Sequence, residues 1–326
     1  MSEQSSENGG EKSLSRFRKR LVISIVVGLG IFVALSIYAD VGEVTQAFAK
    51  FRWGYLPLIL ALTFLNYLLR FYKWHYYLGC IGVKIKGIDS LTIFLSGLTM
   101  SVTPAKLGEI FKSYLLKRLK GTEISRSIPV VFAERATDML GLLILAAISF
   151  STFQYGLWVL IIVLAVLLTL IAILQSRRIC VRLLKTFKSV PLINKLSDSL
   201  IIAYESAYTL FRLKTLLVAV SISVLCWGFE CVAMYFVLVG FDTGASVLLS
   251  TFVFSFSSLA GAVSMIPGGL GIAEGSFAGL LILSGTSKGI AASATVIIRF
   301  CTLWFGVIVG LIAMLVIKDK ITGDSR

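Results

Sequence analysis

Long apolar segments separated by short polar connections run along almost the whole chain. Most of them are close to or longer than the ~20 residues that a helix needs to cross the hydrocarbon core of a bilayer. The pattern therefore predicts an all-α fold, that of a polytopic membrane protein. The apolar segments are 21–39, 54–80, 88–104, 127–150, 156–175, 214–240, 246–266, 269–284 and 289–317.

Composition excludes the soluble classes. Hydrophobic residues make up 57% of the chain and charged residues 15%, and the mean hydropathy is +0.91. A soluble domain is roughly 25% charged, so this chain lacks the polar residues to cover a surface in water. The five cysteines show no C-x-x-C spacing and His75 is the only histidine. We therefore expect no metal site and no cofactor.

The net charge of +14 comes from 31 Lys and Arg against 17 Asp and Glu. In a membrane protein, basic residues gather on cytoplasmic loops and contact anionic headgroups. We therefore expect membrane lipids as partners and no nucleic acid. Residues 1–20 are predicted to form a disordered basic cytoplasmic tail, 21–317 a single transmembrane domain and 318–326 a second cytoplasmic tail. The basic segment 177–213 has apolar residues at near-helical spacing, which predicts two amphipathic helices on the inner surface of the cell membrane; a plain basic loop is the alternative.

The positive-inside rule predicts how many segments cross the membrane. If 88–104 crossed, the basic stretch 106–126 would lie outside. The conflict disappears if this region is a re-entrant hairpin that enters and leaves on the cytoplasmic side. Lys318 and Lys320 should also be cytoplasmic, which makes 246–284 a second hairpin, entered from outside. The prediction is about six spanning helices plus two re-entrant helical hairpins, with both termini cytoplasmic; eight full spans is the alternative.

The two predicted hairpins resemble each other. Each has Ser three residues before a Pro, then Pro-x-x-Leu-Gly and a Glu, and an arginine 31 or 32 residues after the Pro. The topology places the copies in opposite orientation, as in the inverted repeats that transporters build around a substrate site. The matching residues are Pro104, Glu109 and Arg135 in one copy and Pro267, Glu274 and Arg299 in the other.

Several charges fall inside apolar segments, where each costs roughly 2.5–3.5 kcal/mol on insertion scales. Glu134, Arg135 and Asp138 share one helix face. They either neutralise one another and hold helices together, or line a polar cavity that cycles a proton or binds a headgroup. Arg70 and Lys73 lie beside Trp74 and His75, which is typical of an interfacial aromatic belt with snorkelling cations.

Arg299 and Glu230 have no opposite charge within a helical turn. The partner of Arg299 should be Glu274, Glu230 or a ligand anion. The glycines of the second hairpin would let backbone N–H groups approach such an anion at a helix N-terminus, and the natural anion inside a membrane is a lipid phosphate. Candidate phosphate-binding residues are Arg70, Lys106, Arg135, Gly268, Gly269, Gly271 and Arg299. Candidates for a polar lining or proton path are Glu109, Glu134, Asp138, Glu230 and Glu274.

Catalytic signatures such as a Ser/His/Asp set, a P-loop or H-E-x-x-H are missing from the sequence, so we expect no enzyme. A membrane-embedded transferase or phosphatase acting on a polyprenyl lipid is an alternative, with Glu134, Asp138 and Glu274 as acid–base groups. A scaffold for a glycosyltransferase is another.

Taken together, the motifs resemble the transmembrane region of lysylphosphatidylglycerol synthases and related free-standing flippase-like membrane proteins. The resemblance covers about 15–320, and Arg70-x-x-Lys73-Trp74 is similar to the family's R-x-x-R-W element, with Lys in place of the second Arg. It implies a flippase-like or scramblase-like module that moves an anionic phospholipid or a polyprenyl-phosphate-linked lipid between leaflets. It also implies a separate glycosyltransferase or aminoacyltransferase as a partner. We expect no aminoacyl transfer, because the sequence has no counterpart of the synthases' soluble domain.

Overall fold

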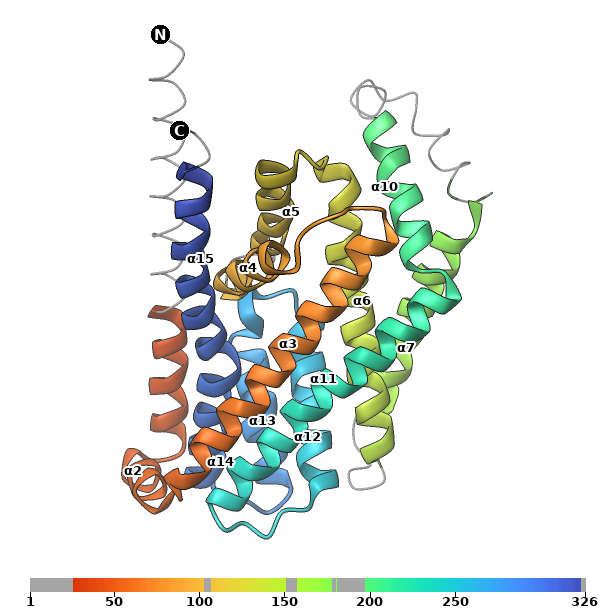
Figure 1. Ribbon diagram of the computed structural model, residues 1–326. Coiled ribbons are helices and arrows are strands. Elements are labelled where there is room, and N and C mark those ends of the chain that lie inside the picture. Colours follow the sequence, from red (N-terminus) through yellow and green to blue (C-terminus); the bar gives the residue numbers. More distant parts are fainter. Residues whose placement is uncertain (1–25, 103–106, 151–156, 178–179, 181–196, 324–326) are drawn as a thin grey trace.

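The computed structural model describes residues 26–102, 107–150, 157–177, 180 and 197–323. These residues form helices and no strand (Figure 1). The predicted tail 1–20, Lys106 and residues 181–196 of the basic segment lie outside them. The first half contains a helix Val26–Tyr38, α2 (Val41–Lys50), α3 (Leu56–Cys80), α4 (Gly87–Leu98), η2 (Thr99–Val102), α5 (Leu107–Lys120) and α6 (Ile124–Ser149). The rest contains α7 (Leu157–Gln175), α10 (Ser197–Leu210), α11 (Leu213–Gly240), α12 (Val247–Val263), η5 (Pro267–Gly269), α13 (Ile272–Leu283), α14 (Lys288–Arg299), η6 (Phe300–Trp304) and α15 (Phe305–Gly323).

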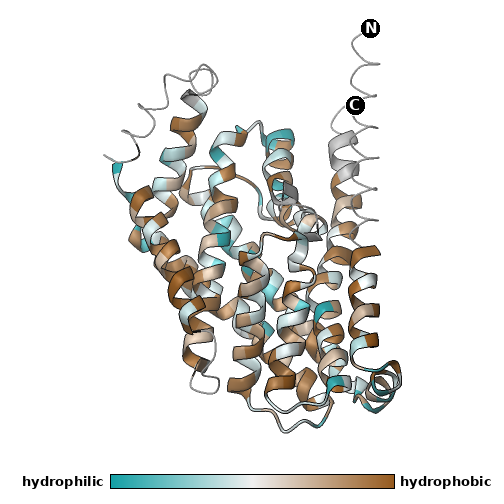
Figure 2. Cartoon of the chain, turned by 180° about the vertical axis from the view of Figure 1, so that it is seen from behind, coloured by the Kyte–Doolittle hydropathy of each residue, from teal (hydrophilic) through white to brown (hydrophobic). Residues whose placement is uncertain are grey.

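The predicted all-α polytopic membrane fold is confirmed. Four helical segments of the described chain are long and apolar enough to cross a membrane: Trp53–Cys80, Leu157–Gln175, Leu213–Gly240 and Lys288–Ile317. The helix Val26–Tyr38 and α2, bent by 101° from each other, make a fifth if the bent pair is counted as one span. With 26 residues, α6 is also long enough, but it carries several charged residues. Figure 2 shows hydrophobic residues along most of the bundle, with hydrophilic residues at its ends and at a few places between them.

The two predicted hairpins are present and are built from short helices. The arms α4 and α5 have 12 and 14 residues, and the arms α12 and α13 have 17 and 12. All four are shorter than the ~20 residues of a full span. We call α4–η2–α5 the first hairpin and α12–η5–α13 the second hairpin. Their tips, η2 and η5, contact each other, and the hairpins approach from opposite ends of the bundle (Figure 1).

The two copies of the repeat also have equivalent residues in the segments that follow the hairpins. Gly121 after α5 and Gly285 after α13 both have positive φ, +66° and +91°, a conformation that suits glycine. Arg135 and Arg299 each follow these glycines by 14 residues. Glu109 and Glu274 each occupy the third position of the helix that leaves the hairpin tip; the Glu109 side chain lies outside the described part of the chain.

An approximate two-fold axis passes between α3 and α11. The two helices lie side by side and run in opposite directions (Figure 1), and Asn66 Nδ2 donates to the Cys226 carbonyl over 2.8 Å, between residues 160 positions apart. Thr63 and Ser223 are separated by the same number of positions. Each of these two hydroxyls contacts a charged residue on the other helix. Contact between equivalent residues is expected only near the axis, so the inverted repeat is centred on this pair of helices.

Hydrophobic packing follows the repeat and interlocks its halves. One cluster of buried residues joins α3, α4, α5, α6 and α7, and it includes Phe211, which precedes α11. The other joins α11, α12, α13 and α14, and it includes Phe51, which precedes α3. Each cluster therefore takes residues from the other half of the chain: Ala219 and Leu259 join Phe211 in the first, and Ile59 joins Phe51 in the second. Within the basic segment 177–213, α10 forms a helix that packs against α6 and α7.

Candidate functional site

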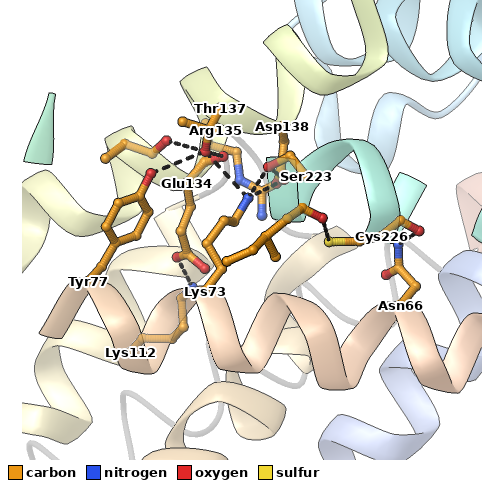
Figure 3. A network of polar contacts seen from close by, with 12 residues as sticks. Asn66, Lys73, Tyr77, Lys112, Glu134, Arg135, Thr137, Asp138, Ser223 and Cys226 are labelled. Atoms are coloured by element: carbon orange, nitrogen blue, oxygen red, sulfur yellow. Dashed lines mark hydrogen bonds and ion pairs between the residues drawn. The ribbon is translucent and has the colours of Figure 1, made fainter. Parts of the chain in front are cut away.

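A buried ion pair links three helices of the bundle. Lys73 on α3 lies 2.5 Å from Asp138 Oδ1 on α6, and its ammonium also donates to Ser223 on α11 over 2.7 Å (Figure 3). The Lys73 side chain is 0% exposed. The interfacial position predicted for Lys73 is therefore wrong: inward-facing polar partners on α6 and α11 hold its charge inside the protein.

A second ion pair holds the first hairpin to α6. Lys112 on α5 lies 2.5 Å from Glu134 Oε2, and its Nζ is 4.4 Å from the centroid of the Trp74 ring. The lysine stem packs on Gly97 of α4, where an added Cβ would come within 2.6 Å of Lys112 Cγ. Glycine at that position therefore leaves room for the cation between the hairpin arms.

Arg135 and Arg70 are more accessible than the two lysines. The Arg135 side chain is 28% exposed, and its Nη1 is 3.8 Å from Asp138 Oδ2, a longer contact than the lysine pairs make. Arg70 is half-buried, with its guanidinium 5.5 Å from the Trp227 ring centroid. The cluster therefore has two deeply buried lysines and two more accessible arginines.

The second hairpin has an ion pair at its tip. Arg299 Nε donates to Glu274 Oε1 and Arg299 Nη2 donates to the Gly268 carbonyl, each over 2.6 Å. The other Glu274 oxygen accepts from the Gly271 backbone N–H over 2.7 Å, in the manner of a capping box. We call these four residues the tip clamp, because they tie the turn of the second hairpin to the end of α14.

The glycines of this tip allow the chain to turn sharply. Gly268, Gly269 and Gly271 all have positive φ, and a Cβ on Gly269 would lie 3.0 Å from Gly261 Cα. The N–H of Gly269 donates to the Ile266 carbonyl. The amides of Gly269 and Gly271 thus already have partners within the protein, and Gly268 contributes its carbonyl.

Glu230 differs from the other buried acids. It is 2% exposed and accepts a hydrogen bond from Thr63 Oγ1 over 3.2 Å. Of the partners expected for Arg299, the structure selects Glu274 and not Glu230.

Most predicted site residues lie in the two areas just described. Glu134, Arg135 and Asp138 share a helix face as predicted, but Glu134 and Asp138 are each neutralised by a lysine from another helix. Lys106 and the side chain of Glu109 fall outside the described residues. Sequence reasoning missed Lys112, because it lies in a basic stretch that reads as a loop. The residues Thr63, Asn66 and Ser223 were missed because single polar residues in apolar segments carry little signal.

Comparison with known proteins gives consistent results. A family model described as the lysylphosphatidylglycerol synthase TM region matches residues 22–310. A UPF0104 membrane protein of Methanocaldococcus jannaschii is 25% identical over 69% of this chain and 97% of its own length. Two UPF0104 membrane proteins of Methanothermobacter thermautotrophicus are 23% and 24% identical; each alignment covers 86% of this chain and 91% or 89% of the relative.

Proposed function

Since the chain belongs to the lysylphosphatidylglycerol synthase transmembrane-region family, we propose that it is a lipid transporter. In this proposal it moves an anionic phospholipid or a polyprenyl-phosphate-linked lipid between the leaflets of the cell membrane. The observation that carries the proposal is the contact between the tips of two oppositely oriented hairpins, with buried ion pairs beside them. Broken helices that meet inside an inverted repeat are the arrangement that many transporters use for their substrates.

The arginines are the better candidates for binding the lipid phosphate. The side chains of Lys73 and Lys112 are 0% and 5% exposed, against 28% for Arg135 and 14% for Arg299. Guanidinium groups also bind phosphate in a bidentate geometry that an ammonium cannot match. We infer that the lysines hold the helices together, whereas Arg70, Arg135 and Arg299 receive the phosphate. The glycine turn would border the same site.

The buried acids suit a different role in this mechanism. A phosphate approaching Arg299 or Arg135 must replace a carboxylate that is now the arginine's partner. Exchange of one anion for another keeps each guanidinium compensated inside the membrane, where an unpaired charge is expensive. Asp138 and Glu274 would therefore release and recapture the arginines as the lipid passes, and Glu134 and Glu230 would complete the polar lining.

Reconstitution into proteoliposomes tests this function. We expect the protein to speed the transbilayer movement of a labelled polyprenyl phosphate, an acidic phospholipid or its aminoacyl form, and the lipid that moves identifies the cargo class. Arg52→Ala is the matched control, because Arg52 pairs with Asp242 at an exposed site and should leave the rate unchanged. If folded protein moves none of these lipids, transport is refuted. Product formation in detergent would then favour the transferase or phosphatase alternative.

The proposed orientation has both termini in the cytoplasm. Lys117, Arg118 and Lys120 end α5, and Arg212 and Lys214 flank the start of α11. These helix ends lie at the same end of the bundle (Figure 1), which the positive-inside rule assigns to the cytoplasm.

Cysteine labelling from each side checks the orientation. In a Cys80→Ser background, Lys120→Cys should react only from the cytoplasmic side, and Thr286→Cys, in the turn between α13 and α14, only from outside. The remaining native cysteines are buried and give a low background. Labelling of position 120 from outside would contradict the topology of the first hairpin.

A further inference from the structure

Glu230 is set apart by what surrounds its carboxylate. Within the described helices, Glu134, Asp138 and Glu274 each lie 2.5 to 2.6 Å from a lysine or arginine nitrogen. Glu230 is equally buried, yet its hydrogen-bond donor is the neutral hydroxyl of Thr63. No lysine or arginine of the described chain approaches its oxygens within 4 Å.

An ionised carboxylate in such a place is costly, because neither water nor a cation compensates its charge. Binding a proton removes that cost, and the resulting carboxylic acid keeps its hydrogen bond to Thr63. We propose that Glu230 is a proton-binding site and that its proton controls the position of Arg70. The step is a simple protonation: the carboxylate gains one proton from a hydronium ion, which leaves as water, and becomes neutral.

Arg70 is placed to respond to this change. Its guanidinium lies over Trp227, and Trp227 and Glu230 are three residues apart on α11, so they face the same side of the helix. Arg70 is also close enough to act electrostatically on both Glu230 and Asp138. When Glu230 is neutral, Arg70 rests on the aromatic ring as a cation–π partner. When Glu230 loses its proton, Arg70 moves from the ring into an ion pair with it.

Few other titratable groups interact electrostatically with Glu230. Within the described residues, α3 contributes Tyr67 and Arg70, α11 contributes Cys231, and η6 contributes Cys301. The charged residues of the neighbouring helices already have partners: Asp138 on α6 pairs with Lys73, and Arg299 at the end of α14 pairs with Glu274. The helix α12 has no titratable residue. Among these groups, Arg70 is therefore the cation that can neutralise a negative charge on Glu230.

The consequence for transport rests on the proposed function. When Glu230 is protonated, Arg70 is available to a lipid phosphate. When Glu230 is ionised, Arg70 pairs with Glu230 and no longer binds the phosphate. Proton and anionic lipid would therefore bind together, and acidification should tighten lipid binding. For a single coupled proton the affinity changes by at most about tenfold per pH unit.

Infrared difference spectroscopy tests the proton site without requiring transport. The wild type minus Glu230→Gln spectrum at neutral pH should contain the C=O band of a protonated carboxylic acid. Glu274→Gln is the matched control and should give no such band, because Glu274 is paired with Arg299. Glutamine is isosteric and can still accept from Thr63, so the fold should be kept. Absence of the band for Glu230 overturns the proposal.

Lipid binding then tests the coupling. With spin-labelled phosphatidylglycerol and a labelled polyprenyl phosphate in nanodiscs, the wild type should bind one of them more tightly as the pH falls. Glu230→Gln should hold the acidic-pH affinity at every pH. An unchanged pH dependence in Glu230→Gln refutes the coupling. If the wild type binds neither lipid, the proposed function fails, and the infrared band still decides whether Glu230 carries a proton.

Discussion

Removing both charges of the tip clamp together should stop lipid movement while the protein stays folded. In the double variant Arg299→Met and Glu274→Gln, the glutamine oxygen can still accept from the Gly271 N–H, so the cap of α13 is kept. No buried charge is left without a partner, and neutral replacements of a buried pair are often well tolerated. The proposed phosphate ligand is gone, however. We expect the rate in proteoliposomes to fall at least tenfold, with a thermal midpoint in detergent close to that of the wild type.

The single variants give the contrast that makes this result informative. Arg299→Ala leaves Glu274 buried beside the hairpin tip without its cation and the Gly268 carbonyl without its donor. Breaking a buried pair in this way costs about 3–5 kcal/mol, so activity and stability should fall together. Arg52→Ala removes an exposed pair with side chains 57% and 80% exposed, which is worth about 0–1 kcal/mol. Rapid lipid movement by the folded double variant would show that the tip clamp is a structural device only.

Most of the fold was predictable because the features that determine it, apolar runs, turns and basic stretches, can be recognised in single segments of the sequence. Apolar runs of near-span length identify the helices. The Pro-Gly-Gly turn and the basic stretch 106–126 identify the hairpins, since a chain with these features cannot place eight full spans without exposing positive charge outside. The pairing of Arg299 with Glu274 was among the predicted alternatives, because Arg299 has no acid within a helical turn.

The site was less predictable because its partners come from distant helices. Lys73 resembles an interfacial lysine in sequence, and only the approach of Asp138 from α6 and Ser223 from α11 explains its burial. Lys112 lies between hairpin arms whose packing depends on Gly97. Neither spacing nor composition contains this information, since it arises when the helices assemble.

The buried pair of Lys73 and Asp138 should decide whether the protein folds at all. Lys73 is the point where α3, α6 and α11 meet, and its ammonium contacts Asp138, Ser223 and Thr137. Removal of the lysine leaves the Asp138 charge among buried groups. A lost partner of this kind costs about 3–5 kcal/mol, a large share of the 5–15 kcal/mol that stabilises a typical protein.

We therefore expect Lys73→Met to accumulate poorly in the membrane and to aggregate on heating in detergent well before the wild type. Adding Asp138→Asn removes the stranded charge and should restore most of the folded protein, because the asparagine can still bond to Ser223. Lys214→Met, at an exposed position before the apolar part of α11, is the control and should behave as the wild type does. Normal accumulation of Lys73→Met alone would mean that Asp138 finds another cation, and Arg135, 3.8 Å away, would be the residue to substitute next.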